Sequence, residues 1–190
     1  MLTSAQKSLL YLLKQHVPAD DEEARTLHYA LTYVEMEPVI HDRRTVPVHA
    51  TGALLVLDPA ERKVLLTRAP DGDGYALFTT HDVGVQDVAV SALHAAMRET
   101  RLLDLVLARP LSVLDLALID VPAQDGERAH RHLELRFVAY GSARWPVADP
   151  QRQRWFTREE AMGQLRIPGA ARLLSRLRWS GEANALRLVR

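Results

Sequence analysis

The chain contains no cysteine, and this absence excludes disulfides, thiolate metal sites and a cysteine nucleophile. Lysine is nearly absent as well, because Lys7, Lys14 and Lys63 are the only lysines and arginine supplies the other cations. Neither sign of charge is in excess, since Lys+Arg and Asp+Glu number 24 each. A chain without net charge has no global field that attracts nucleic acid, so we expect no nucleic-acid partner.

Long hydrophobic runs are also missing. The apolar stretch at the start of the chain is interrupted by Gln6, Lys7 and Lys14, so it fits neither a signal peptide nor a membrane span. We therefore expect no membrane contact and a cytoplasmic location. With 190 residues, of which 47% are apolar, the chain is long enough for one domain with a sizeable core.

The first 47 residues are predicted to form a helical extension. Apolar residues recur at helical spacing over residues 4–16, and a second helix opens at Asp20 with acidic residues in its first turn. We expect both helices to pack on a main domain that spans residues 48–190. The alternative is that they form the contact of a homodimer.

Alternating apolar runs and turn signals predict the elements of the main domain. Ala53–Leu57 and Val64–Thr67 flank an Asp-Pro turn and predict a β-hairpin. A helix is expected over Val88–Leu105, and many alanines would let it approach a sheet closely. The remaining predictions are strands over 75–80, 111–119 and 133–140, a helix capped by Thr157 and Glu160 after Trp155-Phe156, and a last helix over 168–177 with Arg172 and Arg176 exposed.

Gly84, Arg98 and Glu99 stand at the spacing of a known signature. Together with the hairpin and the late Trp155-Phe156 segment, they resemble the Nudix superfamily, whose signature reads G-x5-E-x7-R-E-U-x-E-E-x-G-U, with U a bulky aliphatic residue. The resemblance implies an α/β fold in which a mixed β-sheet is sandwiched between α-helices. The match is degenerate, because aliphatic residues replace three glutamates and a glycine at positions Val90, Leu102, Leu103 and Leu105.

The resemblance implies hydrolysis of a nucleoside diphosphate linked to another group, with Mg²⁺ or Mn²⁺ held by clustered carboxylates. Only Glu99 remains of that cluster, so Glu99 is the expected metal ligand and a candidate catalytic residue. Asp82 and Asp87 precede the helix and are within reach as further ligands. His81 aligns with a family histidine if the loop from Thr79 to Gly84 contains an insertion, and it is then a candidate substrate-binding residue.

A second group of polar residues lies on a predicted strand. Strand periodicity places His130, His132, Glu134 and Arg136 on one face, and leucines and a phenylalanine on the other. His132 and Glu134 are candidate catalytic residues, and His130 and Arg136 are candidate substrate-binding residues. His130, His132 and Glu134 also suit a transition metal. The alternatives are a solvated polar face, or histidines hydrogen-bonded inside a cleft without any metal.

Three functions fit these residues. The protein is a metal-dependent pyrophosphohydrolase with a rebuilt metal site, an enzyme that converts a small nucleotide-like or biosynthetic ligand in the Nudix cleft, or a regulator that binds such a ligand without turnover. The lost carboxylates favour the last two over ordinary Mg²⁺-dependent hydrolysis. The sequence leaves open whether the chain is a catalyst and whether it needs any cofactor.

Overall fold

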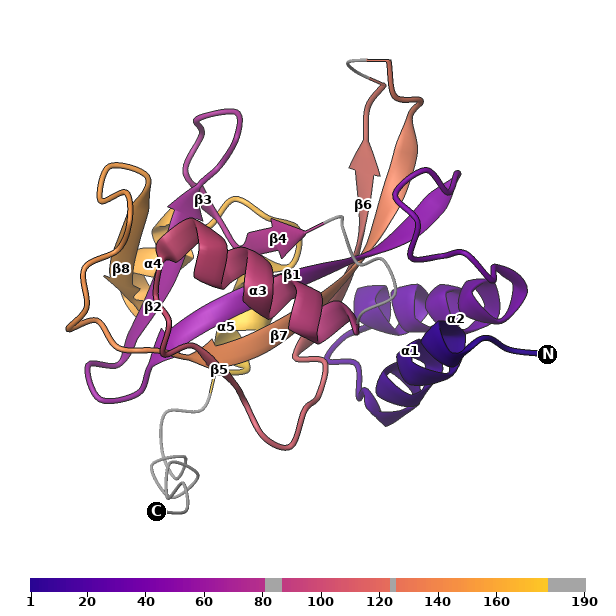
Figure 1. Cartoon of the computed structure of the whole chain (residues 1–190), viewed down its shortest axis with the longest axis horizontal. Helices are drawn as coiled ribbons and strands as arrows, with labels where there is room; N and C mark the ends of the chain where they lie inside the picture. Colours follow the sequence, from indigo (N-terminus) through magenta and orange to yellow (C-terminus); the bar gives the residue numbers. More distant parts are fainter. Residues whose placement is uncertain (81–86, 124–125, 178–190) are drawn as a thin grey trace.

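The computed structural model describes residues 1–80, 87–123 and 126–177 of the chain. Within these ranges an eight-stranded mixed sheet carries helices on both of its faces (Figure 1). The helices are α1 (Ser4–Gln15), α2 (Asp21–Met36), α3 (Val88–Thr100), α4 (Arg158–Gln164) and α5 (Ala170–Ser175). In this described part of the chain, no helix is both long enough and apolar enough to cross a membrane.

Two long parallel strands form the centre of the sheet. The strands are β1 (Val48–Asp58), β2 (Lys63–Arg68), β3 (Tyr75–Ala76), β4 (Phe78–Thr80), β5 (Val106–Leu107), β6 (Asp115–Val121), β7 (His130–Tyr140) and β8 (Gln153–Thr157). β1 pairs with β7 along ten consecutive residue pairs, from Val48 opposite Arg131 to Leu57 opposite Tyr140. Each long strand also changes its other neighbour along its length. β1 pairs first with β4 and then with β2, while β7 pairs first with β6 and then with β5.

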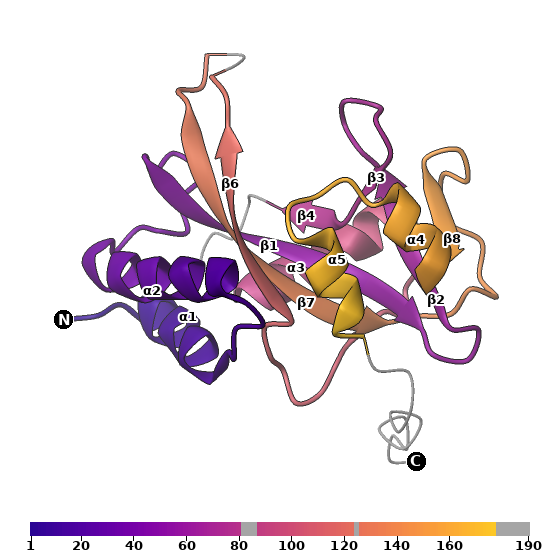
Figure 2. The same ribbon diagram turned by 180° about the vertical axis from the view of Figure 1, so that it is seen from behind.

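The two faces of the sheet differ in what covers them. α3 lies on one face, and α4 and α5 lie on the other, as Figures 1 and 2 show from opposite sides. Along β7, alternate residues Leu133, Leu135 and Phe137 enter the core under α3, which confirms the predicted apolar side of this strand. The polar residues of β7 therefore lie on the opposite face.

Small side chains bring α3 close to β1. A β-carbon placed on Gly52 would stand 2.7 Å from the carbonyl oxygen of Val88 and 3.1 Å from the β-carbon of Ala92. Ala92 and Ala96 are fully buried. The alanines of α3 thus permit the close approach to the sheet that the sequence predicts.

The predicted helix over Val88–Leu105 was too long by five residues. α3 ends at Thr100, whose hydroxyl donates to the carbonyl of Ala96 and accepts from the N–H of Leu102. Arg101 then adopts the left-handed conformation with φ 57°, which stops the helix. Leu102 and Leu103 consequently lie beyond the helix, where Leu102 is buried in the core and Leu103 is 82% exposed.

Two further predictions needed correction in their extent. The strand predicted over 111–119 begins only at Asp115, where pairing with β7 starts, and continues to Val121. The last helix is shorter than predicted. Neither Arg172 nor Arg176 is exposed as expected, because their side chains are only 9% and 22% accessible and both contact carboxylates. The hairpin of β1 and β2 and the capping box of Thr157 with Glu160 are confirmed.

Buried charges join the N-terminal helices to the rest of the molecule. Glu23 of α2 is fully buried and binds His16 at 2.8 Å and Arg176, after α5, at 2.9 Å. Its carboxylate also accepts hydrogen bonds from the N–H groups of Ala19 and of Leu116 in β6. One carboxylate therefore connects the extension, the sheet and the C-terminal helix.

Candidate functional site

Three histidines from the two central strands lie side by side near the first residues of β1 and β7. β1 contributes His49 and β7 contributes His130 and His132, and the parallel pairing places His49 directly opposite His132. The ring centroids are 4.7–5.0 Å apart in all three pairs. Each ring offers one nitrogen, and these three nitrogens lie within 4.8 Å of one another. The Nε2 atoms of His130 and His132 are 3.0 Å apart.

Backbone carbonyls orient two of these rings. Nδ1 of His130 lies 2.8 Å from the carbonyl oxygen of Arg128, and Nδ1 of His49 lies 3.2 Å from that of Thr45. A carbonyl only accepts, so each Nδ1 carries a proton and donates. In the neutral rings the lone pair therefore lies on Nε2. The hydrogen bond from Nδ1 to the carbonyl fixes the orientation of the ring. Histidines that bind a metal through one nitrogen commonly donate from the other nitrogen in the same way.

The polar face continues along β7 beneath α5. Glu134 is buried and binds the side chain of Arg136 at 2.8 Å. Arg136 is fully buried, and its guanidinium also binds Asp115 at 2.8 Å and the carbonyl of Pro168 at 2.6 Å. Arg172 binds the other oxygen of Asp115 at 2.6 Å. Glu134 and Arg136 thus lie on the predicted face, but they support α5 and do not join the histidines.

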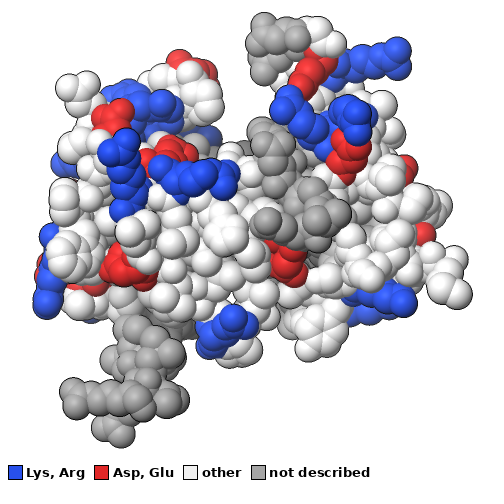
Figure 3. Space-filling view, in the orientation of Figure 1, with Lys and Arg blue, Asp and Glu red and all other residues white. Residues whose placement is uncertain are grey.

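A cavity of about 300 Å³ borders the histidine cluster. Arg43, Arg44, Arg128 and His130 line it, together with Val46, Gly126 and Glu127. Figure 3 shows basic side chains, with acidic ones among them, gathered at the projecting end of β6 and β7. Two of the arginines have acidic partners, since Arg43 pairs with Glu127 and Arg44 with Asp42, and Arg44 lowers the pKa of Asp42 to about 2. Three arginines and one glutamate line the cavity, so positive side chains still outnumber negative ones, and planar guanidinium groups suit an anion.

The expected magnesium site at Glu99 stays a prediction, because Asp82, one of its expected further ligands, lies outside the described residues. Glu99 is exposed at the end of α3, and its carboxylate accepts a hydrogen bond of 2.8 Å from Thr67. Across residues 1–80, 87–123 and 126–177, the only group of three potential metal ligands is His49, His130 and His132. Mg²⁺ and Mn²⁺ prefer several oxygen ligands, and within the described residues no group of three potential ligands includes Glu99.

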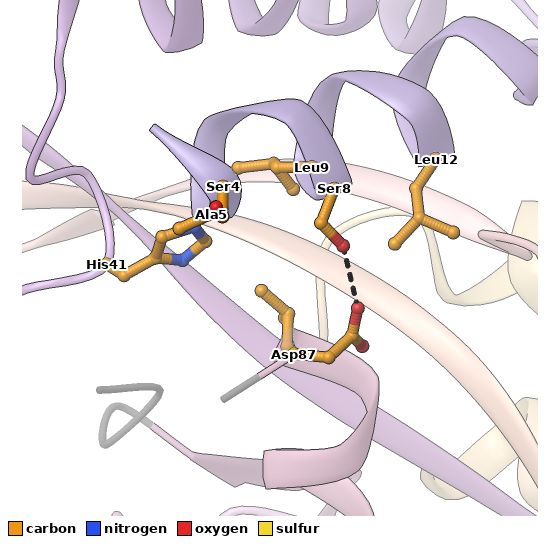
Figure 4. Close-up of a pocket in the computed structure, with 8 residues that line it drawn as sticks. Ser4, Ala5, Ser8, Leu9, Leu12, His41 and Asp87 are labelled. Carbon is orange, nitrogen blue, oxygen red and sulfur yellow. Dashed lines mark hydrogen bonds between the residues drawn. The ribbon is translucent and has the colours of Figure 1, made fainter. Parts of the chain in front are cut away.

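Asp87, the other acid expected near this helix, is already engaged. One carboxylate oxygen caps α3 by accepting from the N–H of Ala89, and the other accepts from the hydroxyl of Ser8 at 2.9 Å. Figure 4 shows this contact in a cavity of about 250 Å³ between α1 and the start of α3. His41 also lines the cavity, and burial lowers its pKa below the ordinary value. Asp87 therefore ties the N-terminal extension to α3.

The structure brings together only part of the predicted site. His130 and His132 adjoin, and His49 completes the cluster in the place predicted for Glu134. No local pattern in the sequence links His49 to the other two histidines, because they lie more than 80 residues away and only strand pairing joins them. His81, Asp82 and Gly84 lie outside the described residues.

The comparisons with known proteins identify the fold. No family model and no curated protein matches the sequence. Among solved structures, a binary complex of a C. elegans Ap4A hydrolase aligns with a TM-score of 0.50 and 14% identity, over 67% of this chain and 93% of that one. A NUDIX-family hydrolase from Clostridium perfringens aligns with a TM-score of 0.48, 13% identity and coverage of 67% and 95%. The E. coli dihydroneopterin triphosphate pyrophosphohydrolase aligns with a TM-score of 0.47, 10% identity and coverage of 67% and 93%. The chain has the Nudix fold.

Proposed function

We propose that this Nudix-fold protein binds a small anionic ligand, of the nucleotide type, at the histidine-lined end of β1 and β7. The observation that carries the proposal is the meeting of His49, His130 and His132 beside a cavity of about 300 Å³ lined by arginines. Guanidinium groups bind phosphate oxygens in pairs, and a neighbouring imidazole can donate, accept or transfer a proton. The arginines would thus bind the anionic ligand, and the neighbouring histidines could transfer a proton to or from it.

The lack of further carboxylates in the Nudix signature around Glu99 supports placing the ligand at the histidines. Ordinary Nudix chemistry needs several carboxylates around Mg²⁺, and Glu99 is the one member of that set in its place. The helix ends before the positions at which further acids would share its face. We therefore assign ligand binding and any conversion of the ligand to the histidine face, with Glu134 and Arg136 as the framework behind it.

Calorimetric titration with nucleotides tests this proposal. The shared fold with a C. elegans Ap4A hydrolase makes adenosine mono- and polyphosphates the first probes. We expect saturable binding that His132→Ala weakens by about tenfold, equivalent to about 1.4 kcal/mol. Glu99→Gln should leave the affinity unchanged. The matched control is His94→Ala, which removes an exposed histidine from α3, away from the cluster.

A phosphate-release assay separates this proposal from metal-dependent hydrolysis. The same nucleotides are incubated with the protein in Mg²⁺ or Mn²⁺, and product is measured for the wild type and for Glu99→Gln. We expect no metal-dependent release that requires Glu99. Release that is abolished by Glu99→Gln but retained by His132→Ala would contradict the proposal and establish a rebuilt pyrophosphohydrolase.

A further inference from the structure

We infer that His49, His130 and His132 form a binding site for a single transition-metal ion, with Zn²⁺ as the natural occupant. This metal site rests on the proposed function in that it lies in the same histidine face to which we assign ligand binding. It replaces the carboxylate of Glu134, predicted from the strand pattern as the third ligand, with the imidazole of His49. The basis is the geometry of three rings from two paired strands.

The distances are close to those that a metal needs. A Zn–N bond of about 2.0–2.1 Å in a tetrahedral site separates neighbouring nitrogens by about 3.4 Å. The Nε2 atoms of His130 and His132 are 3.0 Å apart, and the ligand atoms of all three histidines fall within 4.8 Å of one another. Small rotations of the rings would bring these nitrogens to equal distances from one ion.

The protonation pattern is also that of a metal site. Nδ1 of His130 and Nδ1 of His49 each lie within hydrogen-bond distance of a backbone carbonyl, so in its neutral form each ring carries its lone pair on Nε2. The contact between the Nε2 atoms of His130 and His132 requires a proton or a cation between them. A metal ion would replace that proton and bind both nitrogens. The carbonyls of Arg128 and Thr45 are then the outer shell that holds the ligands in place.

The identity of the ligands selects the class of metal. Neutral imidazole suits Zn²⁺, Co²⁺, Ni²⁺ and Cu²⁺, whereas Mg²⁺ and Ca²⁺ require oxygen ligands. Three protein ligands leave a fourth tetrahedral position, which in such sites is taken by water or by a ligand. His130 lines the arginine-rich cavity, so a bound anion would lie next to the ion. Thr51 follows His49 by two residues in β1 and therefore faces the same side of the sheet as His49.

Metal uptake by the full-length chain tests the site without any knowledge of the ligand. The protein is stripped with a chelator and dialysed against Zn²⁺, and bound metal is counted by elemental analysis. We expect about one Zn²⁺ per chain. Replacement by Co²⁺ should give the intense visible absorption of a tetrahedral ion. Acid should release the metal, because protons compete for the imidazoles.

Two variants and one control assign the binding to these residues. His132 is half-buried, so His132→Ala is the first variant, and His49→Gln keeps most of the volume of the fully buried ring. Each should weaken Zn²⁺ binding more than about 100-fold, since loss of an outer-shell partner alone costs about 10- to 100-fold. His94→Ala should bind like the wild type. If neither variant folds, Zn²⁺-dependent shifts of three histidine ring nitrogens in the ¹H–¹⁵N spectrum of the wild type give the same information.

The outcomes separate this inference from the proposed function. A wild type that takes up neither Zn²⁺ nor Co²⁺, or variants that bind Zn²⁺ as tightly as the wild type, would overturn the metal site. Nucleotide binding by the stripped protein would then still support the proposed function. Conversely, Zn²⁺ uptake that depends on His132, with no nucleotide bound by the loaded protein, would support the metal site and overturn the proposed ligand.

Discussion

The buried carboxylate of Glu23 gives the sharpest prediction about stability. Glu23 is fully buried, whereas its neighbour Glu22 has a side chain that is 70% exposed. Both are glutamates in the first turn of α2, and both contact an arginine at or just after α5. Glu23→Gln and Glu22→Gln therefore make the same chemical change at two levels of burial.

The expected magnitudes follow from the contacts that each carboxylate makes. The amide of Glu23→Gln places an NH₂ group opposite the N–H of either Ala19 or Leu116, and a buried N–H without an acceptor costs about 1–3 kcal/mol. It also leaves Arg176 and His16 without their counter-charge. Breaking such a buried pair costs about 3–5 kcal/mol, and we adopt that range for the whole substitution. Glu22→Gln removes one exposed pair at 3.3 Å, worth about 0–1 kcal/mol.

Urea unfolding and thermal unfolding, both followed by circular dichroism, measure the free energy of unfolding and the Tm of each variant against the wild type. A domain of this size shifts its Tm by about 2–4 °C per kcal/mol, so Glu23→Gln should lower Tm by about 6–20 °C and Glu22→Gln by less than about 4 °C. If the two variants unfold with free energies within about 0.5 kcal/mol of each other, burial does not determine the contribution of this carboxylate, and the reasoning fails.

Two further predictions concern the same fold. Burial alone would raise the pKa of Glu23, but the Ala19 N–H, His16 and Arg176 outweigh it and hold the pKa below 4.5 in the folded state. The stabilisation is thus complete above that pH and is lost as pH falls through the lowered pKa, so acid titration of unfolding should be shallower in Glu23→Gln. Leu102→Ala should destabilise by about 2–5 kcal/mol because Leu102 is buried, whereas Leu103→Ala should stay within about 0.5 kcal/mol, as thermal unfolding would show. Equal losses at the two leucines would contradict the placement of Leu102 in the core.

Local patterns in the sequence determined most of the elements. Alternating residues set the apolar and polar faces of β7, a turn signal set the hairpin of β1 and β2, and Thr157 with Glu160 set the start of α4. These features depend on neighbours a few residues away, so their physical causes are visible in the chain itself. The length of α3 was harder to predict, because no proline or glycine marks its end and Arg101 adopts a positive φ without being a glycine.

Only the tertiary structure decided which residues lie together in the candidate site. The strand pattern placed Glu134 beside His132, but the buried guanidinium of Arg136 holds that carboxylate, and Asp115 from β6 fixes the guanidinium in turn. The same fold brings His49 opposite His132 across 83 positions of chain. Such contacts arise from the parallel pairing of β1 with β7, and pairing between distant strands is set by the packing of the whole sheet rather than by any local run of residues.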